Sequence, residues 1–149
     1  MRYGIRKKGF TLMMAVLVAG ILLAIGLAIF NITIKELQIS SSGRDSQFAF
    51  YAADSGIECA LYWDQKQDSF ASSTPSTIVC NGVGIPNMGG KDYGEASTFS
   101  YEVDGLCSVV SVTKNETHPR TVMEAKGYNT SCESTTSSRR LERAIRVTF

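Results

Sequence analysis

The sequence predicts an α+β fold in which one long N-terminal helix packs against a small antiparallel β-sheet. Two observations lead to this prediction. The chain opens with a long apolar run and contains no proline before Pro75, so one continuous helix is sterically allowed. From about residue 67 onward Ser, Thr, Gly and β-branched residues dominate, and short alternating segments between turn signals predict strands.

The apolar run from Phe10 to Phe30 predicts a membrane-spanning helix. Its only polar side chain is Thr11, and about twenty such residues are enough to cross a hydrocarbon core of roughly 30 Å. The preceding residues, MRYGIRKKG, carry four basic side chains and no acidic one, and such a flank stays on the cytoplasmic side. We therefore expect residues 10–34 to span the membrane once, with the C-terminal part exported.

Residues 35–66 are expected to continue the helix as an amphipathic extension. Aromatic and small side chains recur there at spacings near three and four, which predicts one stripe that docks on the sheet. The charged side chains of this segment fall at other angles around the helix. The predicted stripe consists of Phe48, Tyr51, Ala52, Cys59, Ala60 and Trp63.

Residues 67–149 are expected to form the globular domain. Thr77–Cys80 is interpreted as a short first strand. The stretch Asn81–Glu95 contains five glycines and a proline, and it is interpreted as an irregular surface loop. Its glycines do not have the spacing of a nucleotide-binding loop, so no phosphate site is predicted there.

Three further strand regions complete the predicted sheet. Apolar and polar residues alternate from Phe99 to Val103, and Asp104-Gly105 is a two-residue turn typical of hairpins. Additional strands are predicted from Thr121 to Tyr128 and from Leu141 to Phe149. Together these segments predict an antiparallel meander laid on the helix.

Four widely separated cysteines predict disulfides. No two of them form a CxxC pair or a Cys/His pair with zinc-site spacing, so no metal site is expected. Disulfides persist in oxidising compartments, which agrees with export of this half. Three connectivities remain open, and closeness along the chain favours two bridges, Cys59 with Cys80 and Cys107 with Cys132.

No catalytic site and no cofactor are predicted. Lys and Arg total 15 against 14 for Asp and Glu, so the net charge of +1 creates no overall field toward nucleic acid. His118, the only histidine, is interpreted as a turn residue because Pro119 follows it, and no serine has a His/Asp pair near it. Six carboxylates expected in turns or on outward strand faces are interpreted as solvated: Asp64, Asp68, Asp92, Glu95, Glu102 and Asp104.

Four arginines near the C-terminus raise the question of an anionic ligand. A basic strip formed by them could contact phosphates, including nucleic acid. Strand alternation, however, divides them between two faces, and charges on edge strands often serve only to prevent unwanted pairing, which is the interpretation we favour. The residues are Arg139, Arg140, Arg143 and Arg146. The N-x-[ST] matches at Asn115 and Asn129 are of a kind common by chance.

The run KKGFTL, from Lys7 to Leu12, followed by an unbroken apolar helix, resembles the processing site of type IV prepilins and pseudopilins. The resemblance implies a cleaved leader, residues 1–9, recognised through Lys7 and Lys8. It also implies that a membrane peptidase cuts between Gly9 and Phe10 and N-methylates the new terminus. Because the cut precedes the apolar run, the mature chain keeps its anchor, and a pilin-like fold is expected.

One position departs from the family pattern. Most members carry Glu as the fifth mature residue, whereas this chain has Met14 there, and no acid occurs before Glu36. The family precedent for lacking this Glu is a minor subunit at the filament tip. We therefore expect a minor subunit, and the alternative is a divergent pilin in which the missing charge pair is compensated elsewhere.

Two functional hypotheses follow. The first is a structural subunit of a type IV pilus or a type II secretion pseudopilus-like filament. It would be inserted in the inner (cytoplasmic) membrane as a single-pass precursor and then assembled at the cell surface. The resemblance implies as partners the prepilin peptidase, an assembly platform, a motor ATPase and other pilins. The second is a monomeric, membrane-anchored adhesin or binding module that acts through the loops Asn81–Glu95 and Ser131–Ser138.

Overall fold

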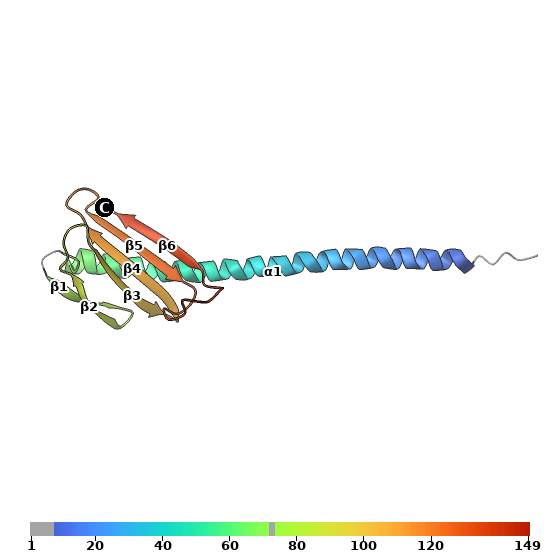
Figure 1. Cartoon of the computed structure of the whole chain (residues 1–149), viewed down its shortest axis with the longest axis horizontal. Coiled ribbons are helices and arrows are strands. Elements are labelled where there is room, and N and C mark those ends of the chain that lie inside the picture. Colours follow the sequence, from blue (N-terminus) through green and yellow to red (C-terminus); the bar gives the residue numbers. More distant parts are fainter. Residues whose placement is uncertain (1–7, 72–73) are drawn as a thin grey trace, which may run out of the picture. The chain divides into compact units, whose positions relative to one another are not determined.

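The computed structural model describes residues 8–71 and 74–149 and confirms the predicted α+β fold. One helix, α1 (Lys8–Gln67), is followed by six strands (Figure 1). The strands are β1 (Pro75–Cys80), β2 (Val83–Gly89), β3 (Ala96–Val103), β4 (Leu106–Lys114), β5 (Thr121–Tyr128) and β6 (Glu142–Thr148). The chain divides into two compact units, Met1–Ser42 and Gly43–Phe149, and each is described by itself.

Within the first unit the described residues belong to α1 alone. The helix runs on into the second unit and ends at Gln67, within one residue of the predicted end. Asp68 then adopts a left-handed conformation, with φ of 49°, which ends the helical path. The continuous helix agrees with the absence of proline from this part of the sequence.

Strands β3 to β6 form an antiparallel four-stranded meander in sequence order (Figure 1). The predicted hairpin is confirmed: Val103 pairs with Leu106, and Asp104 and Gly105 between them both have positive φ, 51° and 77°. Two successive positive φ values match a turn whose twist suits flanking strands. The predicted strand Thr121–Tyr128 is present with the same bounds, and β6 lies within the predicted Leu141–Phe149.

The first two strands form a separate hairpin and correct one prediction. Thr77–Cys80 lies within β1, but part of the expected loop Asn81–Glu95 is strand β2. Asn81 and Gly82 form the connecting turn, with φ of 49° and 77°. The pairing register shifts between Ser76 and Ile78 of β1, opposite the segment of β2 that contains Pro86. Such a bulge disrupts the ladder locally, so a proline, which has no N–H to donate, is tolerated there.

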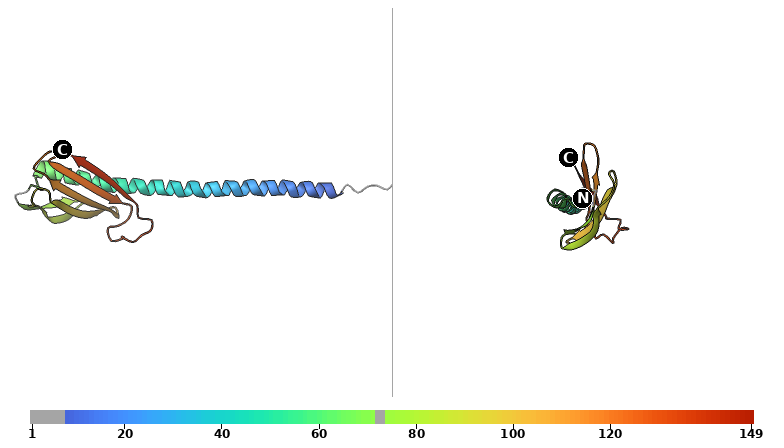
Figure 2. Two further views of the ribbon diagram at one scale, coloured as in Figure 1. Left: turned by 45° about the horizontal axis from the view of Figure 1, so that its top comes forward. Right: turned by 90° about the vertical axis from the view of Figure 1, so that its left-hand side faces the viewer.

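The last turns of α1 lie on one face of the four-stranded sheet (Figure 2). The buried helix face consists of small residues, namely Ala49, Ala52, Ala53, Gly56 and Ala60, with Ile57 among them. The predicted docking stripe was therefore partly wrong, because Phe48 and Tyr51 are 43% and 63% exposed. A side chain added at Gly127 of β5 would collide with the helix backbone, so the helix lies too close to the sheet for aromatic rings at this contact.

The hydrophobic core lies between α1 and the two sheets. Three aromatic rings line up across it: Phe70 stacks on Phe99 at 6.2 Å between centroids, and Phe99 on Tyr101 at 6.4 Å. The Tyr101 hydroxyl lies 2.9 Å from the Ser55 hydroxyl of α1, so its buried polar end has a partner. Around the rings pack the aliphatic side chains of Ile57, Ile78, Val110, Val112 and Met123.

Candidate functional site

The candidate processing site lies at the very start of α1. Lys7 lies outside the described residues, and Lys8 is the first residue of the helix. The Gly9–Phe10 peptide bond therefore belongs to the first helical turn, whose N–H groups have no partner within the helix. Helix termini open at lower cost than helix interiors, so this bond lies in one of the two parts of α1 that unfold locally with least cost. The Phe10 side chain is 69% exposed.

After Phe10 the helix carries a long uncovered apolar surface. Every described side chain from residue 10 to 44 is exposed, and α1 is long and apolar enough to cross a membrane. Signal sequences and buried core helices can have the same length and composition. Here the apolar stretch is not buried in the rest of the chain, so the helix is compatible with membrane anchoring.

No carboxylate lies within this apolar segment. Met14 occupies the fifth position after the candidate cleavage site and is 48% exposed. The first acidic residue of the chain is Glu36, next to Lys35. An ammonium group formed at Phe10 would thus find no opposite charge in the membrane part of its own helix, where an unpaired charge is costly.

The two favoured disulfides are both present. Cys59 of α1 is joined to Cys80 at the end of β1, with 5.9 Å between their Cα atoms. The indole Nε1–H of Trp63 donates to the carbonyl of Val79 at 2.9 Å. A covalent bond, which the sequence predicted, and a hydrogen bond, which it did not, therefore fasten β1 to the last turns of the helix.

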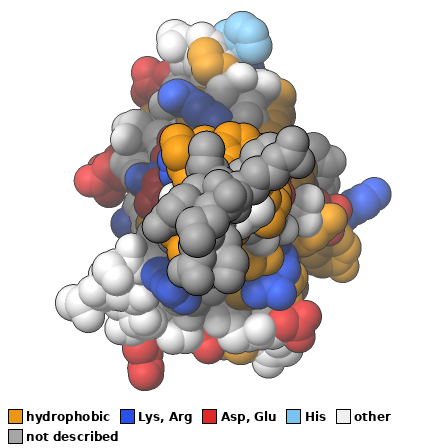
Figure 3. Space-filling model, turned by 90° about the vertical axis from the view of Figure 1, so that its right-hand side faces the viewer, with side chains coloured by type: hydrophobic (Ala, Val, Ile, Leu, Met, Phe, Trp, Pro, Cys, Tyr) orange, Lys and Arg blue, Asp and Glu red, His pale blue; other side chains and the backbone are white. Residues whose placement is uncertain are grey.

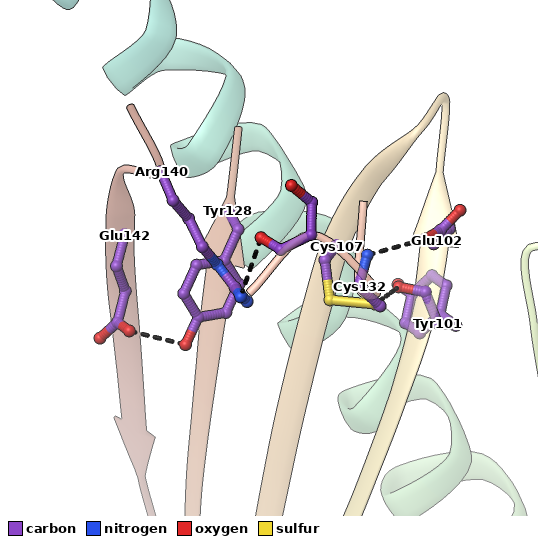
Figure 4. Close-up of a disulfide and its surroundings, with 8 residues drawn as sticks. Tyr101, Glu102, Cys107, Tyr128, Cys132, Arg140 and Glu142 are labelled. Atoms are coloured by element: carbon purple, nitrogen blue, oxygen red, sulfur yellow. Dashed lines mark hydrogen bonds between the residues drawn. A yellow bond between two sulfur atoms is a disulfide. The ribbon is translucent and has the colours of Figure 1, made fainter. Parts of the chain in front are cut away.

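The second disulfide anchors the loop that precedes β6 (Figure 4). Cys107, at the start of β4, is joined to Cys132, with 4.7 Å between Cα atoms. The backbone N–H of Cys132 donates to the Glu102 carboxylate at 2.7 Å. Glu102 is exposed as predicted, but it also holds the loop in place, which sequence reasoning missed.

The side chain of Arg140 holds the same loop against the sheet (Figure 4). Its guanidinium lies 3.9 Å from the centroid of the Tyr128 ring, a cation–π contact. The Tyr128 hydroxyl donates to Glu142 at 2.6 Å. Burial and this carboxylate both raise the pKa of the Tyr128 phenol, and Arg140 opposes the rise.

The four C-terminal arginines do not form a basic strip. Arg143 donates through Nε to the Ser46 hydroxyl of α1 at 2.7 Å, and Arg146 pairs across the ladder with Glu124. Arg140 is held on Tyr128, and the exposed Arg139 lies in the loop. Acidic and basic side chains are interspersed on the visible part of the face in Figure 3, so no single-sign surface is presented there.

One carboxylate prediction was wrong. Asp64 was expected to be solvated, but it is 7% exposed and forms an ion pair with Lys114 of β4 at 2.5 Å. Lys114 Nζ also donates to the Thr121 hydroxyl at 3.0 Å. Asp64 follows Ala53, Ile57 and Ala60 at helical spacing, so its place on the buried face could have been read from the sequence. The other predicted carboxylates are exposed.

The remaining candidates lie in turns. His118 lies in the exposed connection between β4 and β5. Asn115 donates through Nδ2 to the carbonyl of Pro119 at 3.0 Å, and Asn129 uses both ends of its amide to hold Arg139 and Leu141. The side-chain amides of Asn115 and Asn129 therefore brace turns. In residues 8–71 and 74–149, no group of three or more His, Cys, Asp or Glu side chains is placed to hold a metal ion.

Comparison with known proteins adds no relative: no family model matches the chain, and no curated protein or solved structure matches it significantly.

Proposed function

We propose that this protein is a structural subunit of a type IV pilus-like or type II secretion pseudopilus-like filament, produced by cleavage between Gly9 and Phe10. The observation that carries the proposal is the uncovered apolar surface of residues 10–34, directly preceded by the run Lys7-Lys8-Gly9. A cut before this surface leaves it on the mature chain, whereas an ordinary signal peptide takes its apolar segment away.

An apolar helix retained in this way must be covered first in the membrane and then in the filament. In the precursor, lipid covers it while the basic leader stays at the cytoplasmic side. In a filament outside the membrane, burial against the same segment of neighbouring subunits removes its apolar surface from water, which drives assembly. The partners that this proposal requires are a prepilin peptidase, an assembly platform with its motor, and other pilin subunits.

Met14 favours a minor subunit over a subunit that repeats along the whole filament. A carboxylate at that place would offer a partner to the terminal ammonium of an adjoining subunit, and no acid occurs between Phe10 and Lys35. A subunit at the tip has no neighbour above it to match in this way. Immunogold labelling should then mark few sites on each filament, and dense labelling along the whole length contradicts a minor role.

The decisive experiment is the N-terminal sequence and intact mass of the protein isolated from its native membrane. The expected product begins at an N-methylated Phe10. Gly9→Val should leave the leader attached, because the branched side chain blocks the cut, whereas Gly20→Val is the matched control inside the helix, where an added Cβ meets nothing within 4 Å.

Two outcomes reject the proposal. An intact Met1 on the native protein points instead to a monomeric, membrane-tethered binding module. A product cut after Phe30 shows that the apolar segment is removed, so it cannot form a filament core.

A further inference from the structure

A hollow of about 690 Å³ lies where β4 ends and β5 begins, beside the residues that follow α1. Its size falls within the range of small-ligand pockets, roughly 300 to 1,000 Å³. The last residue of the chain, Phe149, lines it, and its place is the end marked C in Figure 1. All of the lining residues belong to the second compact unit.

Two aromatic side chains lie on opposite flanks of this hollow. Tyr93 is 54% exposed and comes from the β2–β3 connection, which is held at the end of β4 by the Gly94 N–H donating to Lys114 at 2.8 Å. Phe149 is 41% exposed and lies beyond β5, where it exchanges two backbone hydrogen bonds with Thr121. The ends of β4 and β5 therefore separate the two rings.

The polar side chains of the hollow include both donors and acceptors that no protein group uses. Among the described residues, the side chains of Asp68, Glu116 and Arg120 line the hollow without an ion pair or a hydrogen bond. Lys114 also lines it, but Asp64 already balances its charge. The uncommitted charged groups are thus two carboxylates that accept and one guanidinium that donates, and the His118 imidazole, which also lines the hollow, adds a ring that can donate and accept.

We propose that this hollow binds a neutral carbohydrate. Each sugar hydroxyl both donates and accepts, so it can satisfy carboxylates and a guanidinium side by side. The apolar C–H faces of a sugar ring can lie on Tyr93 and Phe149. Phosphate and sulfate groups and the carboxylate of a sialyl group carry negative charge and are repelled by Asp68 and Glu116. This inference goes beyond the filament proposal and does not depend on it.

The test uses the full chain in a detergent that has no sugar head group. The protein is applied to a glycan microarray that carries neutral, sialylated and sulfated oligosaccharides, and the strongest neutral ligand is then titrated in solution. Neutral glycans should bind in preference to the charged ones. Tyr93→Ala and Arg120→Gln should each weaken the solution affinity by about tenfold, the loss expected for one ring contact or one charged hydrogen bond.

Matched controls separate this site from the rest of the surface. Tyr62→Ala removes an equally exposed tyrosine, at 54%, from α1, and Arg146→Gln removes an arginine from β6; neither should change the affinity. Thermal unfolding of all four variants shows that they fold, as expected at exposed positions. The proposal is overturned if no neutral glycan binds, if charged glycans or a peptide bind better, or if Tyr93→Ala and Arg120→Gln leave the affinity unchanged.

Discussion

Gly127 of β5 lies against the backbone of Ala49 in α1 so closely that no side chain fits between them. A Cβ atom at residue 127 would overlap the Ala49 carbonyl oxygen and the Ala53 amide nitrogen. Backbone atoms of a helix cannot rotate away as the end of a long side chain can. The distance between helix and sheet is therefore set by this glycine, together with Gly56, whose added Cβ would overlap Ser108 and Val110 of β4.

Gly127→Ala is expected to destabilise the second unit by about 3 kcal/mol or more, at the upper end of the usual cost of overpacking. The measurement is the free energy of unfolding of the full chain in detergent, with unfolding monitored by near-ultraviolet circular dichroism. Gly84→Ala in β2 is the control, since an added Cβ there meets nothing within 4 Å and the residue has no positive φ. Equal unfolding free energies for the two variants would show that the helix moves away from the sheet at little cost.

The same close contact explains what the sequence could and could not predict. Absence of proline and the apolar run were enough to predict α1, and Asp104-Gly105 was enough to place the β3–β4 hairpin. The docking face was partly wrong because hydrophobicity favoured Phe48 and Tyr51, whereas the contact selects for small size. No pattern within α1 alone states how near the sheet will lie.

Three further features were missed, for two different reasons. Asn81-Gly82 is a strong hairpin signal, but Pro86 in the following segment argued against a strand until the bulge explained it. The Asp64–Lys114 pair and the Arg140–Tyr128 contact each join residues from separate elements. The path of the chain between such residues decides whether they meet, and periodicity within one segment carries no information about that path.

Lys114→Met is expected to lower the free energy of unfolding by about 3 kcal/mol, because it leaves the buried Asp64 carboxylate without its cation. Combining it with Asp64→Leu should recover most of the loss, since the double variant buries no charge. Lys126→Met is the control: its pairs with Glu124 and Glu142 are 3.9 and 3.8 Å long and exposed, so it should cost less than about 1 kcal/mol. If the double variant is no more stable than Lys114→Met, the unpaired charge is not the cause.

Tyr101 should make the fold sensitive to alkaline pH. Burial raises the pKa of its phenol above the ordinary value of 10.0, and the hydrogen bond with Ser55 partly opposes the rise. Above about pH 10 the unfolded chain releases this proton while the folded chain retains it, so stability falls as pH rises toward the folded-state pKa. The free energy of unfolding measured at about pH 8 and about pH 11 should therefore fall less in Tyr101→Phe than in the unaltered protein.

Tyr51→Phe serves as the control for this pH effect, because Tyr51 is 63% exposed on the outer side of α1. The Tyr51→Phe variant should lose as much stability between about pH 8 and about pH 11 as the unaltered protein does. An equal loss in Tyr101→Phe as well would mean that ionisation of Tyr101 does not contribute.

Arg140 is expected to order the loop between Cys132 and β6. Its guanidinium lies on the Tyr128 ring and its Nη1 donates to the Ser134 carbonyl at 3.3 Å. Loss of a cation–π contact and one hydrogen bond, together roughly 1 to 2 kcal/mol, should speed local opening of the loop by about tenfold in Arg140→Ala. Amide hydrogen exchange of residues 133–140 measures this opening.

Arg139→Ala provides the matched comparison for the loop. Arg139 has the same charge and is the adjacent residue, but its side chain is exposed and makes no hydrogen bond, ion pair or ring contact among the described residues. Its replacement should leave amide exchange unchanged, because the Cys107–Cys132 bridge and the Asn129 amide still hold the loop ends. Equal exchange in the two variants would show that the Arg140 contacts do not order the loop and that the attachments at its two ends are sufficient.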